Sequence, residues 1–479
     1  MYLKKITLKN IKCFNELSIN FTEKHQARLW TTLFGENGLG KSTLLQAIGV
    51  VLAGPSAVRE LLPVAEGWVR RGEPYGEIEA ELLWTEGDTL IPGWPKKVTP
   101  YIVRYIVTGS DPERLPESLA KEFYYTVPTL VPWPGEGTSK QRENITKDMR
   151  RLQQSAYAEG KAGWLGCGYG PFRRLSGGSQ DADRILYAER KSARFVTLFR
   201  EDAALTNATE WLIKLYNTAR DGDVAGQRAL AHVRNVFAYD LFPEPIELEV
   251  NAQNALLKTG ERVQVPLRDL SDGYRSMLAL SIDLLRWLIN AFPEDENPMN
   301  HSGVVLIDEL DAHLHPRWQR EIGHWLRAKF PKIQFIVATH SPFLAQVADV
   351  VSEGVPGLSS DTNQVGSGNI CLRSTEYGVQ ADADIEPTRD LRADQIYQSP
   401  LFDLTSLYSP PTQRLLERHQ SLYSKQQTGL LSKEEKQELE QLAFWRDSLP
   451  IMSDTRERRQ EQNLHRAVQH HNDLLQEIA

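Results

Sequence analysis

A nine-residue stretch near the amino terminus carries the residue types that hold a polyphosphate. Residues 35–43 read Gly-Glu-Asn-Gly-Leu-Gly-Lys-Ser-Thr and fit the pattern G-x-x-x-x-G-K-[ST] without a gap. The glycines let the backbone curl so that its N–H groups point at one anion, at the positive end of the next helix. The amino group of Lys41 can then reach the outer phosphates, and the hydroxyl of Ser42 can ligate Mg²⁺. The residues predicted to contact a nucleoside triphosphate here are Gly35, Asn37, Gly38, Gly40, Lys41, Ser42 and Thr43.

The sequence on either side supports this interpretation. Residues 29–34 form a β-branched and aromatic run that predicts a strand, and residues 44–52 form an apolar run that predicts a helix. A phosphate loop needs this order, because the helix that follows supplies the free backbone N–H groups. The alternative is a chance glycine turn before a helix, which does not account for Lys41 and Ser42.

A second segment supplies two carboxylates at the end of an apolar strand. Residues 304–307 read Val-Val-Leu-Ile and predict a buried strand, which Asp308 and Glu309 follow directly. This is the Walker B pattern, in which the first acid holds Mg²⁺ and the second polarises the attacking water as general base. The predicted metal ligands are therefore Ser42 and Asp308, and the predicted base is Glu309. An acidic turn without function is the alternative.

A third segment lies just before the helix that precedes these acids. Residues 270–275 read Leu-Ser-Asp-Gly-Tyr-Arg, and a helix is predicted from Gly273 to about Ile289. The hydroxyl of Ser271 and the amide of Gly273 form an anion site at that helix start. The segment resembles the L-S-G-G-Q signature of ABC-type ATPases, with Asp for the first Gly and Tyr for Gln. The resemblance implies that Ser271 and Gly273 face the γ-phosphate bound by a second copy.

Residues 175–180 (Leu-Ser-Gly-Gly-Ser-Gln) are a rival for this role and are closer to the consensus. We reject them because no apolar helix and Walker B strand follow directly. Their continuation, rich in Asp and Arg, predicts a loop. The glutamine loop of ABC-type ATPases has no clear counterpart, and residues 168–174 are a candidate for lining the nucleotide pocket.

Two further positions carry the resemblance. Asp311, in residues 309–316, resembles the D-loop of the same ATPases, and His340, at the end of a predicted strand 333–338, resembles their switch histidine. That resemblance implies that His340 senses the γ-phosphate. His313 and His315 could be interpreted as a metal pair. Residues at i and i+2 do not share a helix face, so a D-loop structure is preferred.

Composition limits the class of protein. The 479 residues are 41% hydrophobic and 25% charged, with a formal net charge of −8, which argues against an overall basic coat for nucleic acid. Cys13, Cys167 and Cys371 are far apart and have no metal-ligand spacing, which is typical of a reducing compartment. The start of the chain lacks a signal-peptide pattern and no apolar run has membrane-spanning length, so we expect a cytoplasmic protein with no membrane partner.

The order of elements predicts an α/β fold of the ABC-type ATPase head. Alternating segments before residue 34, at 77–84 and at 101–107 predict an antiparallel layer. Short apolar runs separated by helices in the second half predict a parallel core sheet covered on both faces. We expect an ATPase domain at 1–381 with a helical insertion at about 138–240, in which 193–216 is the clearest helix. A helical extension is expected at 382–479.

The loop sequence G-E-N-G-x-G-K-S-T is similar to that of the SMC, RecF and OLD branch of these ATPases. The resemblance to this branch covers about residues 1–351. The strings D-E-L-D-A-H-L-H-P and A-T-H-S-P are especially typical of OLD-like stand-alone ATPases. No heptad pattern for a coiled-coil arm lies between residues 42 and 270. Asp382, Asp384 and Glu386 predict a solvated loop rather than a nuclease site. Residues 391–402 and the helices after them resemble the Septu anti-phage ATPases (PtuA) and, more distantly, the PARIS ATPase AriA.

This resemblance implies an ATP-hydrolysing regulatory subunit with ATP and Mg²⁺ bound between two copies. It implies a homodimer or higher oligomer that gates a separate nuclease, of the HNH type in Septu, in anti-phage defence. The alternative is a RecF- or SMC-like repair ATPase that acts directly on DNA. Its motivation is a basic cluster, for which a solvated helix face is the favoured interpretation. The cluster consists of Arg184, Arg190, Lys191 and Arg194.

Overall fold

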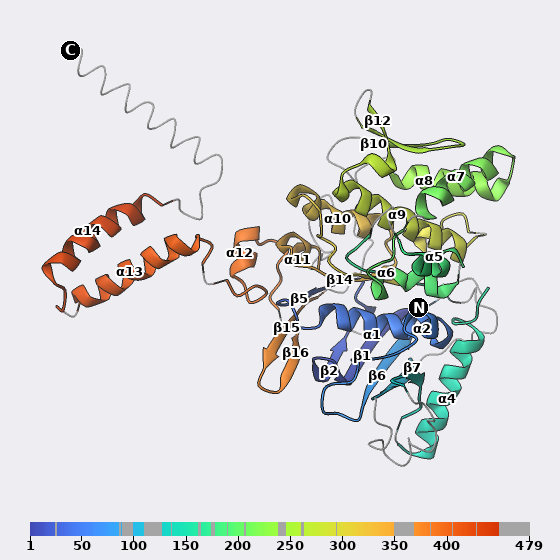
Figure 1. Cartoon of the computed structure of the whole chain (residues 1–479), viewed down its shortest axis with the longest axis horizontal. Helices are drawn as coiled ribbons and strands as arrows, with labels where there is room; N and C mark the ends of the chain where they lie inside the picture. Colours follow the sequence, from blue (N-terminus) through green and yellow to red (C-terminus); the bar gives the residue numbers. More distant parts are fainter. Residues whose placement is uncertain are drawn as a thin grey trace. The chain divides into compact units, whose positions relative to one another are not determined.

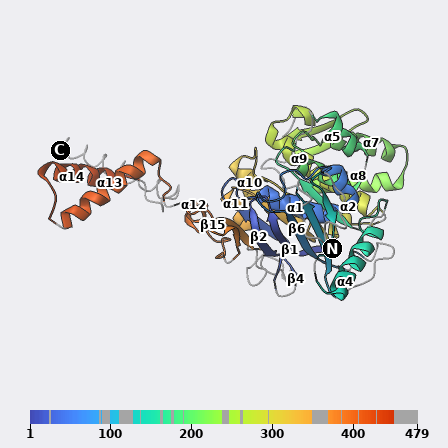
Figure 2. The same cartoon turned by 60° about the horizontal axis from the view of Figure 1, so that its bottom comes forward.

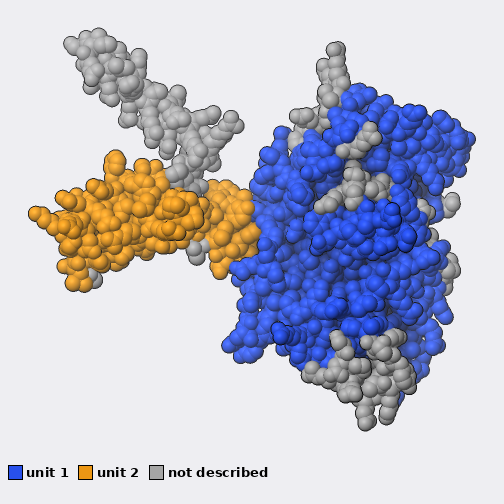
Figure 3. All heavy atoms as spheres, in the orientation of Figure 1, with its two compact units in different colours: residues 1–391 blue, residues 392–479 orange. Residues whose placement is uncertain are grey.

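The computed structural model describes most of the chain. Its residues are 1–23, 26–85, 88, 99–109, 127–135, 137–160, 164–173, 178–188, 190–205, 207–237, 246–259, 263–293, 295–348, 368–383, 385–404, 406–427 and 429–449. The chain divides into two compact units, residues 1–391 and 392–479 (Figure 3). The domain boundary expected after residue 381 stays a prediction.

The strands are β1 (Tyr2–Ile11), β2 (Phe14–Asn20), β3 (Thr22–Glu23), β4 (Gln26–Ala27), β5 (Trp30–Phe34), β6 (Tyr75–Leu83), β7 (Tyr101–Thr108), β8 (Leu130–Pro132), β9 (Leu165–Tyr169), β10 (Ile246–Val250), β11 (Ala255–Thr259), β12 (Val263–Pro266), β13 (Gly303–Ile307), β14 (Ile333–Ala338), β15 (Asn369–Thr375) and β16 (Gly378–Asp382). The helices of the first unit are α1 (Lys41–Ala53), α2 (Pro55–Leu61), α4 (Ser139–Gln154), α5 (Gln180–Tyr187), α6 (Val196–Phe199), α7 (Asn207–Arg220), α8 (Val224–Phe237), α9 (Asp272–Ala291), α10 (Pro316–Lys329) and α11 (Pro342–Ala348). The second unit holds α12 (Ala393–Gln398), α13 (Pro410–Gln427) and α14 (Lys433–Asp447).

Two sheets form the centre of the first unit. The larger has the order β16-β15-β5-β14-β13-β9, in which every pair is parallel except β15 with β16. The other is antiparallel, with the order β2-β1-β6-β7-β8. A parallel core sheet beside an antiparallel layer is the fold expected from the sequence, and this expectation is confirmed.

The core sheet separates two apolar cores, and the alternation of side chains along its strands explains why. Val304 and Leu306 of β13 belong to the core shared with α1 and the antiparallel sheet. Val305 and Ile307 belong to the core shared with α9 and α10. Successive side chains of a strand point to opposite faces, so a continuous apolar run is what a sheet buried on both faces requires.

Helix α1 lies between the two sheets and is apolar almost all round. Its buried residues include consecutive ones, Leu44 and Leu45 and then every residue from Ala47 to Ala53. A helix with this pattern must be enclosed on all sides. Figure 1 shows α1 next to β1 and β2. The packing fixes the start of α1, and hence the phosphate loop before it, relative to both sheets.

One helix expected from the sequence is interrupted. Residues 193–216 were expected to be one helix, but the structure has a 3₁₀ turn (Lys191–Phe195), then α6, and then α7. Arg200 ends α6 with extended backbone angles, and its guanidinium binds the carboxylate of Asp202 at 2.7 Å. Asp202 also accepts a hydrogen bond from Ser179 at 2.6 Å. Tertiary contacts therefore override the local helix propensity.

Strand β9 lies within the region that was expected to be a helical insertion. Its sequence, Leu-Gly-Cys-Gly-Tyr, is unusual for a strand because glycine is depleted in strands. It pairs in parallel with β13 and forms the edge of the core sheet. A Cβ atom at Gly168 would lie 2.7 Å from Leu198 and 2.8 Å from Phe195. Close packing, rather than strand propensity, explains the glycine, and the mostly helical region expected at about 138–240 contains one strand of the core sheet.

Two other segments differ from expectation. The Asp- and Arg-rich residues after Ser179 form helix α5 rather than a loop. The Ser179 hydroxyl caps this helix by accepting a hydrogen bond from the Ala182 amide at 3.1 Å. Asp181 and Asp183 lie in its first turn, where their negative charges interact favourably with the helix dipole. The hairpin β15–β16 was not anticipated, and β15 extends the core sheet beside β5.

The second unit contains a helical hairpin of α13 and α14. Ser432 and Glu435 form a capping box at the start of α14. Arg418 binds Glu438 and Lys425 binds Glu435 across the hairpin, with nitrogen–oxygen distances of 2.8 and 2.7 Å. Residues 450–479 of the helical extension expected at 382–479 lie outside the described residues. Among the described helices, none is long and apolar enough to cross a membrane.

Candidate nucleotide-binding site

The carboxyl ends of β5, β14 and β13 meet at one edge of the core sheet, as they must in parallel strands. A pocket of about 500 Å³ opens there. It is lined by Lys12, Cys13, Asn37, Gly38, Gly40, Lys41, Ser42, Thr43, Asp308, Glu309 and His340. The pocket therefore brings together the phosphate loop, the Walker B acids and the histidine after β14, which are separated by up to about 300 residues in the sequence.

The glycines of the phosphate loop have the conformations for which glycine is needed. The φ angles are 139° at Gly35, 83° at Gly38 and 88° at Gly40, all in the region that L side chains rarely adopt. At Gly35 a Cβ atom would also lie 2.7 Å from the carbonyl oxygen of Leu372. At Gly40 it would lie 2.7 Å from the ring of Phe14. The loop therefore combines positive φ angles at its glycines with close packing against Leu372 and Phe14.

Lys41 opens helix α1 and its amino group folds back over the loop. The Nζ atom donates to the carbonyl of Gly35 at 2.7 Å and to that of Glu36 at 3.1 Å. The side chain is only 8% exposed. Burial lowers the pKa of Lys41, and the nearby carboxylates of Asp308 and Glu309 oppose that shift. These carbonyl contacts hold the amino group over the loop, at the wall of the pocket.

Asp308 has the properties of a metal ligand. Its side chain is buried, and among the described residues its Oδ1 atom has no hydrogen-bond partner. Burial raises the pKa of Asp308, while a hydrogen bond with the Ser42 hydroxyl opposes the shift. An orphaned buried carboxylate oxygen is costly unless a cation is bound. A carboxylate and a hydroxyl are oxygen ligands of the kind that Mg²⁺ prefers, so these residues fit the ion.

Glu309 lies in an unusual backbone conformation. Its φ angle is 46°, in the left-handed region, which is uncommon for a residue that is not glycine. The buried guanidinium of Arg173 donates to the carbonyl of Glu309 at 3.0 Å and to that of Asp308 at 2.7 Å. Burial lowers the pKa of Arg173 to about 10, which leaves it charged at neutral pH. The turn that carries both acids is thus held by a residue that does not line the pocket.

His340 and Asp311 are joined at the edge of the pocket. The Asp311 carboxylate accepts hydrogen bonds from the hydroxyl of Thr339 and, at 3.3 Å, from the backbone N–H of His340. Burial and the positive charge of Lys41 lower the pKa of His340, which keeps the imidazole neutral at neutral pH. Asp311 itself does not line the pocket.

The predicted signature residues lie outside this pocket in the same chain. Ser271 is the N-cap residue of α9, but its side chain makes no capping hydrogen bond. Gly273 is buried, and a Cβ atom there would lie 2.8 Å from the His313 carbonyl oxygen and from the Trp318 ring. Tyr274 packs edge-on against Trp318 with 4.4 Å between the ring centroids. The signature segment is thus anchored to the segment after the Walker B acids, and neither Ser271 nor Gly273 lines the pocket.

Other candidates from the sequence have structural roles. The Nδ1 atom of His315 accepts from the Arg317 amide at 3.2 Å at the start of α10. In the rival segment 175–180, residues 175–177 lie outside the described part of the chain, and Ser179 caps α5. Residues 168–173 do not line the pocket, although Arg173 donates to the backbone carbonyl of Asp308, and residue 174 lies outside the described part of the chain.

The basic cluster does not form one exposed surface. Lys191 and Arg194 are buried, with 5% and 8% of their surface exposed. Lys191 donates to the carbonyl of Ala156, and burial lowers the pKa of Lys191 to about 7. Arg190 pairs with Glu60 at 2.5 Å. Arg184 is the exposed member that pairs within its own helix. The interpretation as a solvated helix face is therefore wrong for Lys191 and Arg194.

Two residues of the pocket escaped sequence reasoning, and so did the role of Arg173 within the candidate segment 168–174. Lys12 and Cys13 lie in the turn between β1 and β2 and line the pocket, and Lys12 has a φ angle of 46° and lies 4.7 Å from the Trp68 ring. The turn has no motif spacing, so no local signal identifies it. Arg173 donates hydrogen bonds to backbone carbonyls, and no residue pattern in the sequence indicates which carbonyls it binds.

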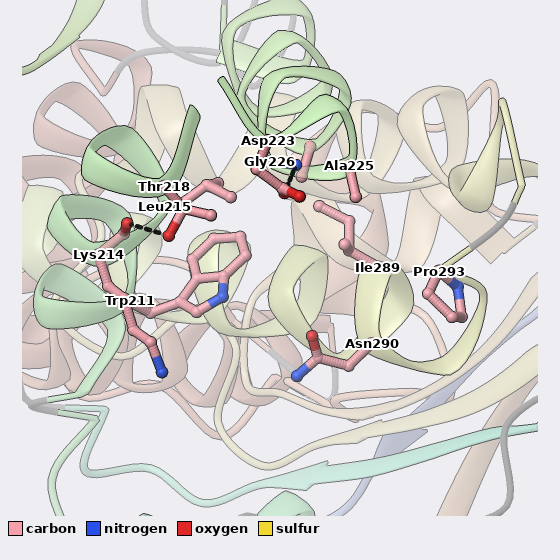
Figure 4. Close-up of a pocket in the computed structure, with 11 residues that line it drawn as sticks. Trp211, Lys214, Leu215, Thr218, Asp223, Ala225, Gly226, Ile289, Asn290 and Pro293 are labelled. Carbon is pink, nitrogen blue, oxygen red and sulfur yellow. Dashed lines mark hydrogen bonds between the residues drawn. The ribbon is translucent and has the colours of Figure 1, made fainter. Parts of the chain in front are cut away.

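A second pocket lies at the other end of α9. It measures about 290 Å³ and lies between α7, α8 and the last turn of α9 (Figure 4). The two helices α7 and α8 are side by side in both views of the chain (Figures 1 and 2). Trp211, Ile289 and Pro293 form apolar walls, and Lys214 and Asn290 are exposed at its edge. The single helix α9 thus connects this pocket with the signature segment.

Comparison with known proteins places the chain in a family. Residues 31–346, more than half of the chain, match the family described as "AAA domain, putative AbiEii toxin, Type IV TA system". The chain belongs to this family. The match runs from β5 through the phosphate loop and both acids to α11, so it covers every predicted nucleotide-contacting segment.

Several curated proteins are similar to the chain. The "Septu protein PtuA" of Bacillus mycoides is 28% identical over 71% of the chain and 38% of that protein. The "Retron Vc95 probable ATPase" of Vibrio cholerae is 35% identical over 29% of the chain and 27% of that protein. The "Retron Ec83 probable ATPase" of Escherichia coli is 41% identical over 22% of the chain and 18% of that protein. The chain thus spans less than half the length of these relatives.

Solved structures that are similar to the chain include SMC heads. One is an SMC head bound to the C-terminal winged-helix domain of ScpA, with a TM-score of 0.45 and 14% identity over 80% of the chain and 97% of that structure. Another is the SMC head domain of Thermotoga maritima, with a TM-score of 0.40 and 15% identity over 80% of the chain and 99% of that structure. Likeness at this level carries no argument about function.

Proposed function

We propose that the chain binds ATP in the pocket at the carboxyl ends of β5, β13 and β14 and hydrolyses it there. The observation that carries the proposal is the composition of this pocket. It combines an anion-binding loop, two acids and a histidine from three separate segments. In this proposal the loop N–H groups and Lys41 bind the phosphates, Glu309 accepts a proton from the attacking water, and neutral His340 donates a hydrogen bond to the γ-phosphate.

Mg²⁺ fits the same pocket, with Ser42 and Asp308 as its protein ligands. The support is the buried Oδ1 atom of Asp308, which has no hydrogen-bond partner among the described residues. When bound, the ion would neutralise charge on the phosphate oxygens. The chain's own residues do the remaining work, since Lys41 and the loop fix the phosphates and the turn at Glu309 orients the base.

A direct test of the pocket is the variant Lys41→Ala. We expect it to lose at least about 100-fold in ATP affinity, because the amino group is the one cation of the phosphate loop. The matched control is Lys332→Ala, an exposed lysine in the turn before β14, at the opposite end of that strand from the pocket. Equilibrium binding of a fluorescent ATP analogue would measure both. Unchanged affinity of Lys41→Ala would overturn the assignment of the loop.

The active form that we propose is a dimer around two ATP molecules. Ser271, Gly273 and Asp311 of one copy would complete the site of the other. The support is that these residues do not line the pocket of their own chain, while the hydroxyl of Ser271 makes no capping bond. The free N–H groups at the start of α9 suit a phosphate.

Mixed copies can test this arrangement. Lys41→Ala copies keep the signature, and Gly273→Glu copies keep the phosphate loop, so each variant alone lacks part of both composite sites. A one-to-one mixture contains dimers with one intact composite site. We expect ATPase activity in the mixture that neither variant shows alone. A mixture that hydrolyses no faster than the sum of its parts would speak against shared sites.

The biological role that we propose is control of a separate nuclease in anti-phage defence. Its support is the similarity to Septu PtuA and to retron ATPases, together with the composition of the second unit. The hairpin of α13 and α14 exposes large apolar side chains, with Phe444 83% exposed and Leu430 75% exposed. In this proposal these exposed apolar side chains contact the partner and are covered by it. The expected partner is an HNH nuclease.

The proposed partner surface can be tested by co-purification. Replacing Phe444 and Leu430 by Ser should abolish capture of an HNH nuclease partner and leave ATP binding intact. The control is Tyr377→Ser, which removes an apolar side chain of similar exposure (73%) from the first unit. Deletion of residues 412–479 should act like the double substitution. Capture that survives both changes would refute this role for the hairpin.

Direct action on DNA, as in RecF-like ATPases, is the second function considered. Its motivating basic cluster does not form an exposed surface, because Lys191 and Arg194 are buried. The measurement that separates the two functions is binding of duplex DNA by the isolated protein as a function of salt. We expect no salt-dependent binding, and an affinity that falls steeply with salt would favour the DNA function.

A further inference from the structure

We infer that Arg173 is a positioning residue for ATP hydrolysis, which holds the turn of Asp308 and Glu309 and couples it to helix α9. The inference rests on the proposed function, since it takes Glu309 as the base. It assigns a role to a residue that touches neither the pocket nor the phosphate loop. The pocket lining contains Glu309 but not Arg173.

The contacts of Arg173 connect three separate segments. Its Nη1 atom donates to the carbonyls of Gly170 at 2.8 Å and Asp308 at 2.7 Å. Its Nη2 atom donates to the carbonyl of Glu309 at 3.0 Å, and its Nε atom donates to the hydroxyl of Ser276 in α9 at 3.2 Å. The side chain is 4% exposed. One planar group therefore fixes the end of β9, the Walker B turn and the signature helix relative to one another.

The conformation of Glu309 shows what the guanidinium stabilises. A left-handed φ of 46° costs free energy in a non-glycine residue and persists only where the surroundings hold it. The hydrogen bond from Arg173 to the Glu309 carbonyl is such a restraint. The backbone angles at Glu309 decide where its Cβ and carboxylate lie. Arg173 therefore sets the direction of the base without contacting the nucleotide.

Through its hydrogen bond with Ser276, Arg173 also connects the Walker B turn to helix α9. Ser276 lies three residues after Gly273, so the two are neighbours on one face of α9. Gly273 packs against the carbonyl of His313, which follows the Walker B acids. When a second copy binds phosphate at the signature segment, a displacement of the first turns of α9 reaches Glu309 through Ser276 and Arg173. The same helix thus links assembly of the dimer with the geometry of the base.

The experiment uses full-length Arg173→Lys and Ser276→Ala, with the ATP dissociation constant and kcat measured separately. Values of kcat are normalised to the number of sites that bind ATP, so that a loss of folded protein does not lower them. For Arg173→Lys we expect a dissociation constant within threefold of wild type and a kcat lowered about 10- to 100-fold. For Ser276→Ala we expect unchanged affinity, an intact turn and a kcat lowered about threefold or more. Arg190→Lys, an exposed arginine paired with Glu60, is the matched control and should behave as wild type.

The readout separates positioning from a purely structural role. A structural role predicts a lower unfolding temperature with a normal kcat per binding site, and that result would overturn the inference. If Arg173→Lys fails to fold, Ser276→Ala tests the inference, because this variant retains the arginine. A wild-type kcat per binding site in Ser276→Ala would then overturn the proposed coupling. Glu309→Gln is measured in parallel. Wild-type hydrolysis by Glu309→Gln refutes the proposed function, whereas an inactive Glu309→Gln beside a normal Arg173→Lys refutes this inference alone.

Discussion

The carboxylate of Asp311 accepts a hydrogen bond from the backbone N–H of His340, with 3.3 Å between Oδ1 and N. The same oxygen accepts the Thr339 hydroxyl, so the turn after β13 is joined to the end of β14. In the proposed dimer, Asp311 approaches the second copy while His340 faces the γ-phosphate. This hydrogen bond therefore connects the dimer interface with the group that contacts the nucleotide.

Removing that connection should slow hydrolysis without loss of ATP binding. Asp311→Ala deletes the acceptor, and we expect kcat to fall about tenfold because His340 loses its restraint. Asp311→Asn keeps an oxygen at the position of Oδ1 and is the matched control, with a smaller loss. Steady-state hydrolysis and equilibrium ATP binding measure the two effects. Equal losses in both variants would show that the charge, rather than the restraint, matters.

Glu309→Gln should abolish most hydrolysis. A general base contributes about 10² to 10⁴ in rate, and glutamine of the same size cannot accept the proton. ATP binding is expected to survive, so the variant should accumulate as an ATP-bound dimer that light scattering can detect. Glu321→Gln removes an exposed glutamate of α10 and should leave both properties unchanged. An unaltered hydrolysis rate in Glu309→Gln would contradict its role as base.

Asp308→Asn should stabilise the empty protein while removing its response to Mg²⁺. Burial raises the pKa of Asp308, which means that the empty pocket disfavours the charged carboxylate. A neutral amide removes that cost, so the unfolding free energy without ligands should rise. Thermal unfolding with ATP and either Mg²⁺ or EDTA should show stabilisation by Mg²⁺ in the wild type only. A Mg²⁺-dependent shift that persists in Asp308→Asn would exclude this residue as a ligand.

The buried amino group of Lys191 should make stability depend on pH. Burial lowers the pKa of Lys191 to about 7 in the folded protein, whereas an unfolded lysine titrates near 10.4. Between these values the unfolded chain binds the extra proton, so the unfolding free energy rises with pH. From pH 7 to pH 9 this group contributes an increase of about 2 kcal/mol.

The variant Lys191→Met removes the titrating group and keeps much of the side-chain volume. Denaturant unfolding at pH 7 and pH 9 should therefore show a smaller increase in the variant than in the wild type. The window stops at pH 9 because Tyr157, whose pKa burial raises above its usual value, opposes the trend at higher pH. The same pH dependence in both proteins would mean that Lys191 does not change its protonation on folding.

The sequence predicted the parts of the site that local patterns determine. The phosphate loop needs glycine conformations and a helix start, and both leave a fixed spacing at 35–43. Strands β13 and β14 are buried on both faces, so they appear as uninterrupted apolar runs. The positions of Asp308, Glu309 and His340 at one edge of the sheet followed from these runs.

The remaining features depend on contacts between distant segments. Strand β9 has two glycines because Phe195 and Leu198 pack against it, so strand propensity could not identify it. The helix expected at 193–216 is interrupted where Arg200 binds Asp202. Arg173 recognises backbone carbonyls, whose positions no residue pattern encodes. Tertiary packing determines all three features: the glycines of β9, the interrupted helix and the contacts of Arg173.

The central claim is that two copies share each nucleotide, and a structure of Glu309→Gln with ATP and Mg²⁺ would test it most directly. The account predicts Ser271 and Gly273 of one copy against the γ-phosphate that Lys41 of the other copy holds. A nucleotide-bound structure in which the 271–273 segment of every copy lies far from all bound ATP would contradict it.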